Sequence, residues 1–164
     1  MKFTNSLIKG KLLKRYKRFF ADIKVNNKII TAHCPNTGSM QGLLDQGNEV
    51  LMTEHNDPKR KLKFTLEIIK AKKRYVGVNT HRANKIVNHG LENKLISEFK
   101  TIKNIKPEFK FSDDTRFDFL CDSNLIEVKN VTLFRENDIA EFPDAVTSRG
   151  TKHLNMLILS LIHI

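Results

Sequence analysis

Two acids and a lysine in the segment RFDFLCDSNLIEVKNVT, residues 116–132, have side chains that can act on phosphate esters: Asp118, Glu127 and Lys129. Carboxylates are hard oxygen ligands of the kind that Mg²⁺ prefers. A metal held by two acids can polarise a phosphodiester and activate water, and a neighbouring lysine can stabilise the charge that develops. We therefore predict Asp118, Glu127 and Lys129 as catalytic residues, with Asp118 and Glu127 as ligands of Mg²⁺.

A hairpin must position these side chains. RFDFLC and LIEVKNV are rich in β-branched and aromatic residues, and DSN between them is typical of a turn. With Leu120 opposite Leu125, Asp118 falls opposite Glu127, with their β-carbons about 4.5–5.5 Å apart. Two carboxylates that close repel each other unless a cation or a shared proton intervenes. The alternative is a solvated hairpin face with a cross-strand ion pair.

The second half of the chain, residues 81–164, has mixed periodicity. THRANKIVNHGLENKLISEF carries apolar residues at helical spacing, and three strand-like runs follow it. FPDAVTSRGTKHLNMLILSLIHI then predicts a helix that begins near Pro143 and Asp144. Arg149 and His153 are four residues apart on this helix, so they share a face. They either reach the acidic patch or remain solvated.

The first half, residues 1–80, has short strand patterns instead. FFADIKV and KIITAHC are joined by NNK, where Asn26 and Asn27 tolerate positive φ. EVLMTEH and KFTLEIIKAKKRYVGV add three more strands. So many short strands predict a small barrel or sandwich, and an oligonucleotide-binding (OB) barrel is the natural candidate. We expect an α+β, or mixed, protein: an OB-like barrel over 1–80 and an α/β domain over 81–164.

Net charge points to a polyanionic partner. Lys and Arg total 29 against 18 acids, a balance of +11, which favours nucleic acid first and an anionic membrane surface second. KGKLLKRYKRF alternates cations with aromatic rings, as single-strand binding requires. The alternative places Phe19 and Phe20 in the barrel core, with solvated lysines beside them. The predicted DNA contacts in this segment are Lys14, Arg15, Lys17 and Arg18.

Two loops add further candidates. HCPNTGSM can bring backbone N–H groups and hydroxyls to a phosphate, or it can be a rigid turn shaped by Pro35. PKRK forms a basic loop tip. The predicted DNA contacts here, with one more on the last helix, are Asn36, Thr37, Ser39, Lys59, Arg60 and Arg149.

The expected location is the cytoplasm. No apolar run has the flanks of a signal peptide or the length of a membrane span. Cys34 and Cys121 are far apart and fit no metal or redox spacing, which favours reduced thiols. We expect DNA as the partner and no membrane partner. Peripheral membrane binding through the amphipathic amino terminus is a weaker third hypothesis.

Several segments together resemble one family. LLKRYKRFFADIKV, TAHCPNTGSM, NDPKRKL, VGVNT, RFDFL, IEVKNVTL and FPDAVTSRGTKHL are similar, in the correct order from about Leu12 to Leu154, to the sugar fermentation stimulation protein (SfsA) family. The resemblance implies an OB-like domain, a PD-(D/E)xK nuclease-like domain and DNA binding. It also implies a role in regulating genes of sugar metabolism, maltose in particular. The nuclease motif carries over onto Asp118, Glu127 and Lys129.

The sequence departs from this family in two places. Family members continue past the last helix with a further strand, so we expect a nuclease-like domain that is truncated and lacks its last strand or strands. Their first helix often carries adjacent acids where this chain has Asn88 and His89, and Glu92 is the candidate replacement. Two functions stay open: a non-catalytic, regulatory DNA-binding protein, or a Mg²⁺-dependent nuclease.

Overall fold

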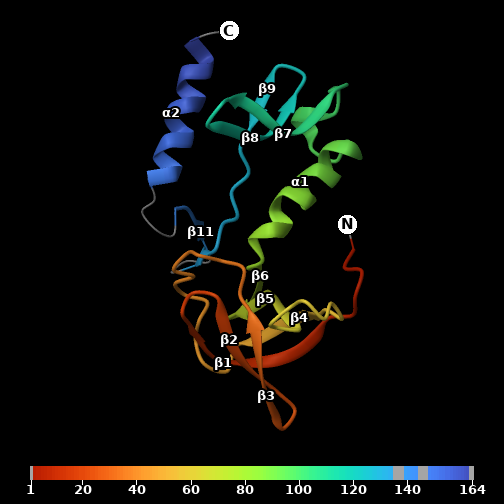
Figure 1. Ribbon diagram of the computed structural model, residues 1–164, viewed down its shortest axis with the longest axis vertical. Coiled ribbons are helices and arrows are strands. Elements are labelled where there is room, and N and C mark those ends of the chain that lie inside the picture. The colour runs from red at the N-terminus through yellow and green to blue at the C-terminus, as the bar shows by residue number, and fades with distance from the viewer. Residues whose placement is uncertain (1, 135–138, 144–147, 163–164) are drawn as a thin grey trace. The chain divides into compact units, whose positions relative to one another are not determined.

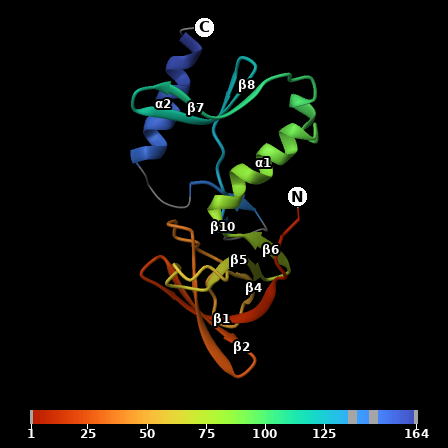
Figure 2. The same ribbon diagram turned by 45° about the vertical axis from the view of Figure 1, so that its right-hand side comes forward.

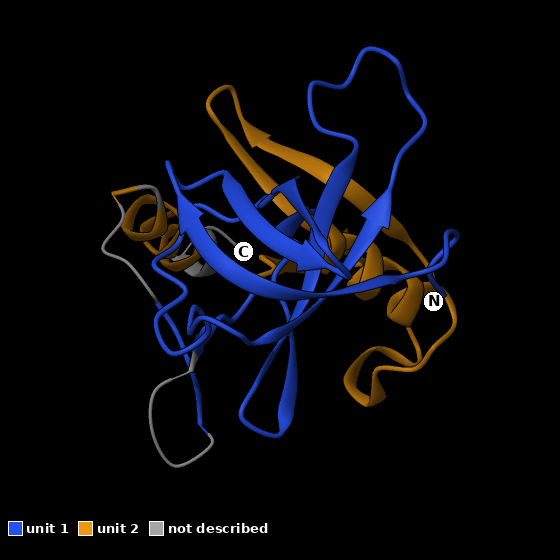
Figure 3. Cartoon of the chain, turned by 90° about the horizontal axis from the view of Figure 1, so that it is seen from below, with its two compact units in different colours: residues 1–81, 130–145 blue, residues 82–129, 146–164 orange. Residues whose placement is uncertain are grey.

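The chain forms two compact units. A computed structural model describes residues 2–134, 139–143 and 148–162 (Figure 1). Unit 1 comprises Met1–His81 with Asn130–Ala145, and unit 2 comprises Arg82–Lys129 with Val146–Ile164 (Figure 3). Residues 130–145, which the sequence analysis assigns to the second half, thus lie in unit 1.

Unit 1 is built on a closed barrel (Figure 2). Its strands are β1 (Ile8–Tyr16), β2 (Phe20–Val25), β3 (Lys28–His33), β4 (Glu49–Glu54), β5 (Phe64–Ala71) and β6 (Arg74–Gly77). They are ordered β3-β2-β1-β4-β5-β6, and a parallel pairing of β3 with β5 closes the first five strands. This five-stranded barrel confirms the OB-like fold expected from the strand spacing.

Local chemistry explains how the barrel closes. Asn26 has a φ of 53° in the two-residue turn between β2 and β3, as the sequence predicts. β1 bends so that it pairs with β4 along its first half and with β2 along its second. Gly10 allows β2 to approach β1 closely, because a β-carbon there would lie 2.4 Å from the Ile23 side chain. The barrel interior is filled by buried apolar side chains that include Leu12, Ile23, Met40, Val50, Met52, Leu66 and Ile69.

A second segment of the chain completes unit 1. It carries the short strands β10 (Leu133–Phe134) and β11 (Ala140–Glu141), which pair with each other. The Asn36 side chain, only 3% exposed, donates to the Val78 carbonyl and to Thr132 Oγ1, both at 3.3 Å. The Asn130 side chain donates to the Gly77 carbonyl at 3.2 Å. These bonds join residues 130–132 to the barrel.

Unit 2 has the predicted order of helix, three strands and helix: α1 (Ala83–Glu92), β7 (Ile105–Ser112), β8 (Thr115–Cys121), β9 (Asn124–Ile126) and α2 (Ser148–Ile162). Short 3-10 turns span Thr80–Arg82 and Ser97–Phe99. The antiparallel sheet is ordered β7-β8-β9. The structure describes α2 from Ser148, and the predicted start at Asp144 lies outside the described residues.

Alternation along β8 separates a core face from a polar face. Phe117, Phe119 and Cys121 are buried, whereas Asp118 and Leu120 are half-buried. The core of unit 2 gathers Leu91, Phe119 and Cys121 with partly buried neighbours that include Val87, Ile96, Phe99, Ile105, Ile126 and Val128. Among the helices of the described residues, none combines the length and the apolar character needed to cross a membrane.

Candidate nucleic-acid interface and metal site

The β8–β9 hairpin has the register that the sequence predicts. Leu120 pairs with Leu125, and Phe119 pairs with Ile126, so the next positions in register are Asp118 and Glu127. The turn is held by Asp122, whose carboxylate accepts the backbone N–H groups of residues 103 and 104. These hydrogen bonds, the Asn104 N–H first, lower the pKa of Asp122.

The hairpin is shorter than LIEVKNV suggests, because β9 ends at Ile126. The cause is a side-chain acceptor: Val128 N donates to Asp118 Oδ2 at 2.6 Å. A short polar side chain that takes up a backbone N–H competes with the strand ladder. Glu127 and Lys129 therefore lie on an irregular segment beyond the strand rather than on its pleated face.

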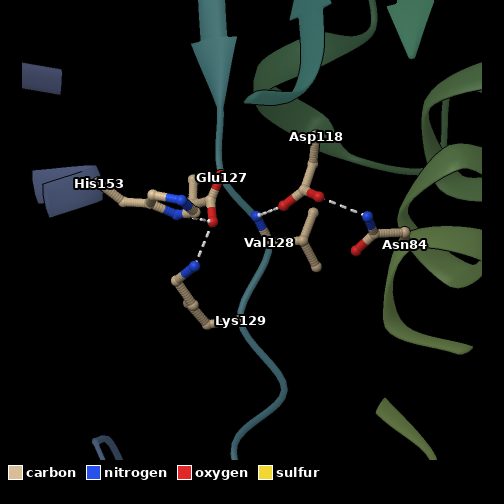
Figure 4. Close-up of polar contacts among 6 residues, drawn as sticks. All are labelled: Asn84, Asp118, Glu127, Val128, Lys129 and His153. Carbon is tan, nitrogen blue, oxygen red and sulfur yellow. Dashed lines mark hydrogen bonds and ion pairs between the residues drawn. The ribbon is translucent and has the colours of Figure 1, made fainter. Parts of the chain in front are cut away.

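Asp118 also contacts α1. Its Oδ1 accepts a hydrogen bond from Asn84 Nδ2 at 2.5 Å (Figure 4). Sequence reasoning missed Asn84 and considered Asn88, His89 and Glu92 instead. Asn88 Nδ2 donates to Glu92 Oε1 at 2.8 Å, so the structure places the Glu92 carboxylate at Asn88. Asn84 is one helical turn before Asn88 on the same face, which is the signal that could have found it.

Glu127 makes a separate set of contacts. Its side chain is 8% exposed, and its Oε1 forms an ion pair with Lys129 Nζ. The same oxygen lies 2.5 Å from Nδ1 of His153, which α2 supplies (Figure 4). Glu127 and Lys129 thus meet as predicted from their spacing, whereas Asp118 has its own donors. The carboxylate repulsion expected from the register is relieved on each acid separately.

These acids have the chemistry of ligands for a hard cation. Each carboxylate accepts N–H donors or pairs with a cation, and carboxylate oxygens are ligands that Mg²⁺ and Ca²⁺ prefer. Within the described residues, no three His, Cys, Asp or Glu side chains lie close enough together to hold a metal. The predicted ligands Asp118 and Glu127 are therefore not joined there by a third such side chain. A pocket of about 280 Å³ lies beside Asp118, between α1 and β7, and is lined by Asn84, Asn88, Glu108 and Phe119 among others.

In unit 1, the turn between β1 and β2 presents two cations. Lys17 and Arg18 are exposed and have φ values of 46° and 62°, which non-glycine residues seldom adopt. Phe19 follows them, and its ring is 43% exposed rather than in the barrel core.

Arg15 holds this turn against a neighbouring loop. Its guanidinium donates to the carbonyls of Arg18 at 2.9 Å, Asn36 at 2.7 Å, Gly38 at 2.9 Å and Ser39 at 3.4 Å. Arg15 is therefore bound to backbone, which makes it a structural clamp rather than a cation free for DNA.

The other predicted DNA contacts of the first half also divide into residues that hold the fold and residues that are exposed. Asn36 is buried, and its Oδ1 accepts the Gly38 N–H at 2.8 Å, so it shapes the loop from within. Thr37 and Ser39 are exposed on that loop. Lys14 Nζ lies 3.7 Å from Asp22 Oδ2 and 5.4 Å from the centre of the Tyr16 ring.

The basic loop between β4 and β5 holds the last pair. Lys59 is exposed, and its N–H donates to Asp57 Oδ1 at 2.9 Å. Arg60 is half-buried and donates from Nη2 to Thr65 Oγ1 at 2.8 Å. Arg149 belongs to α2, but its side chain lies outside the described part of the structure.

The chain is a two-part protein in which an OB-like barrel precedes a unit of helices and sheet. Comparison with known proteins finds the same two parts in the same order. Residues 13–78 match the SfsA N-terminal OB domain, and residues 81–162 match the sugar fermentation stimulation protein RE domain. The chain therefore belongs to the sugar fermentation stimulation protein family.

Relatives and a solved structure extend along nearly the whole chain. A sugar fermentation stimulation protein homolog of Pelagibacter ubique is 64% identical over 162 residues, which cover 96% of this chain and 70% of the relative. The homolog of Alteromonas mediterranea is 46% identical over 93% of this chain and 69% of its own. The structure of Pyrococcus furiosus SfsA in complex with Ca²⁺ is similar with a TM-score of 0.81 and 25% identity, over 96% of this chain and 68% of that one.

Proposed function

We propose that this protein binds DNA through one end of the unit 1 barrel and regulates genes of sugar metabolism, maltose among them. The observation that carries the proposal is the clamp of Arg15, which joins the turn bearing Lys17 and Arg18 to the loop bearing Thr37 and Ser39. Exposed cations and hydroxyls are thereby held together on an ordered backbone. Cations at such a site bind phosphates with release of counterions. The name of the relatives supports the link to sugar use.

The test is DNA binding as a function of salt. In the double variant Lys17→Gln with Arg18→Gln, affinity should fall for every DNA sequence. The slope of log K against log salt should flatten by about two on duplex DNA, since each lost phosphate contact removes about 0.9. The matched control is Lys72→Gln with Lys73→Gln, which removes the same charge from the turn between β5 and β6. Equal losses in both double variants would mean that net charge alone attracts DNA.

A second candidate is a Mg²⁺-dependent nuclease. The observation that favours it is the register of the β8–β9 hairpin. Asp118 and Glu127 are the next residues after its last pair, and Lys129 forms an ion pair with Glu127. The Ca²⁺ complex of the Pyrococcus furiosus relative supports a divalent cation here. Asp118 and Glu127 would hold the cation, which when bound polarises a phosphodiester and activates water. Lys129 keeps a positive charge beside Glu127, where it can attract the scissile phosphate.

One experiment separates the two candidates. Labelled single-stranded and double-stranded DNA are incubated with the protein in Mg²⁺, Mn²⁺ or EDTA, and binding and cleavage are scored together. Binding without cleavage in any metal supports the regulator. Cleavage that needs metal and disappears in Glu127→Gln, while binding persists, supports the nuclease.

A further inference from the structure

A ring stack lies at the end of β3 in unit 1. His33 is the last residue of this strand, and the Phe19 ring stacks on its imidazole with centroids 6.4 Å apart and planes inclined by 30°. Cys34 N donates to the Phe19 carbonyl at 2.8 Å, which holds the turn against the strand. The Phe19 ring is 43% exposed, so a further planar group can reach it.

Arg60 reaches the same end of the barrel from the loop between β4 and β5. Thr65 is the register partner of His33 across the parallel pairing, and Arg60 Nη2 donates to its hydroxyl at 2.8 Å. Arg60 Nε donates to the Leu62 carbonyl at 3.3 Å. These two bonds orient the guanidinium, and its Nη1 has no acceptor among the described residues.

His81 approaches from the segment after β6. Its neighbour Thr80 donates from both N and Oγ1 to the Pro35 carbonyl, at 3.3 and 2.7 Å, and Pro35 is two residues beyond His33. The pKa of His33 is lowered by partial burial first, and then by the positive charges of Arg60 and His81. The Arg60 guanidinium and the His81 imidazole thus lie close enough to His33 to act on its charge.

We propose that Phe19, His33, Arg60 and His81 form a one-nucleotide subsite for single-stranded nucleic acid. The base stacks on the exposed ring of Phe19, and the adjoining phosphate is bound by Arg60 with His33 and His81. The planar fork of arginine matches phosphate oxygens, and aromatic rings stack with any base. The bases of a duplex are already stacked on each other, so only a single strand can use the ring. This subsite rests on the proposed DNA binding and names the strand form that it takes.

The proposal carries a pH dependence. A bound phosphate favours the charged imidazole, so the pKa of His33 is higher in the complex than in the free protein. Its contribution to affinity is complete below the free pKa and is lost as pH rises through the bound pKa. Single-strand affinity should therefore fall as pH rises across the histidine range.

Binding of a labelled oligothymidylate and of a duplex of equal length provides the first test. Phe19→Ala should weaken single-strand binding about fivefold or more and leave duplex binding unchanged. Arg60→Gln should weaken single-strand binding and reduce its salt slope by about 0.7. The controls lie at the other end of β3: Ile29→Ala removes an apolar side chain that is 67% exposed, and Lys28→Gln removes an exposed cation. Both controls should bind as the parent does.

Titration of the parent protein by NMR is the second test, and it needs no substitution. The His33 Cε1–H signal is followed against pH alone, with inorganic phosphate, with oligothymidylate and with a base-free oligomer of equal length. All three ligands should raise the pKa of His33, and only oligothymidylate should also shift the Phe19 ring signals. A His33 pKa unchanged by saturating oligothymidylate would overturn the subsite, as would a Phe19→Ala loss that is equal for single strand and duplex. A parent that binds no DNA at all would overturn the proposed function itself.

Discussion

Arg15 donates to four backbone carbonyls in two loops, which is an unusual use of a surface arginine. Its planar fork suits this role, since several N–H groups leave the side chain in fixed directions. Lysine carries the same charge on a single ammonium and cannot reach all four oxygens. The difference between the two side chains separates a clamp from a phosphate contact.

We predict that Arg15→Lys and Arg15→Gln both destabilise the protein, by about 1–3 kcal/mol, because carbonyls held by a charged donor lose it. Both should also weaken DNA binding to a similar extent, since the loops they release carry Lys17, Arg18, Thr37 and Ser39. Thermal melts and DNA affinity at low salt measure the two effects. An Arg15→Lys variant that binds DNA as the parent does would show that charge alone matters at this position.

The β8–β9 hairpin allows a prediction at the scale of an element. Asp118 and Glu127 are the next residues after the Phe119–Ile126 pair, one on each side of the hairpin. Asp118 nevertheless accepts from Val128 N and Asn84, whereas Glu127 contacts Lys129 and His153. An amide at position 118 would turn an N–H group toward the donors that Asp118 now accepts. An amide at position 127 would remove the negative charge that pairs with Lys129. Without metal, Asp118→Asn and Glu127→Gln should therefore lower stability by about 1–3 kcal/mol.

The same two acids allow a prediction about stabilisation by divalent metal. If both acids hold a cation, Mg²⁺ or Ca²⁺ should raise the melting temperature of the parent in proportion to the logarithm of its concentration. Neither amide variant should show this gain. Asp113→Asn serves as the control, because this acid has a fully exposed side chain on the adjacent turn. Amide variants that are more stable than the parent in EDTA would restore the view that the two carboxylates repel each other.

At the scale of the whole molecule, unit 1 is assembled from two stretches of the chain. Asn36 donates to Thr132 Oγ1 across 96 residues of sequence, and the amide that does so is buried. The loop shaped by Asn36 is the one that Arg15 clamps. The returning segment thus supports the loop of the proposed DNA-binding end.

We predict that Thr132→Val lowers the melting temperature and costs about 1–3 kcal/mol, because it leaves a buried N–H group without its acceptor. Thr132→Ser keeps the hydroxyl and should retain most of the stability. Denaturant unfolding of the three proteins provides the measurement. A valine variant as stable as the serine variant would mean that the segment adds nothing to unit 1 through this bond.

Local patterns in the sequence were sufficient for the elements. Strands β2 to β6, the turn at Asn26, the order of elements in unit 2 and the pairing of Leu120 with Leu125 follow from alternation, helical spacing and turn chemistry. Strand β1 was not among the predicted strands, because its many cations were interpreted only as a nucleic-acid-binding segment. These depend on residues near one another in the chain, so a sequence can specify them. The motifs that carry the family resemblance are local in the same way.

Tertiary structure alone decided how polar side chains are used. Arg15 holds carbonyls, Asn84 reaches Asp118, and Thr132 accepts from Asn36, although no sequence pattern relates these residues. The pairs are brought together by closure of the barrel, by packing of a helix on a sheet, or by the segment that returns to unit 1. A buried or half-buried polar group must find a partner wherever the fold supplies one. The identity of that partner is therefore set by the three-dimensional arrangement, while residue type determines only that a partner is needed.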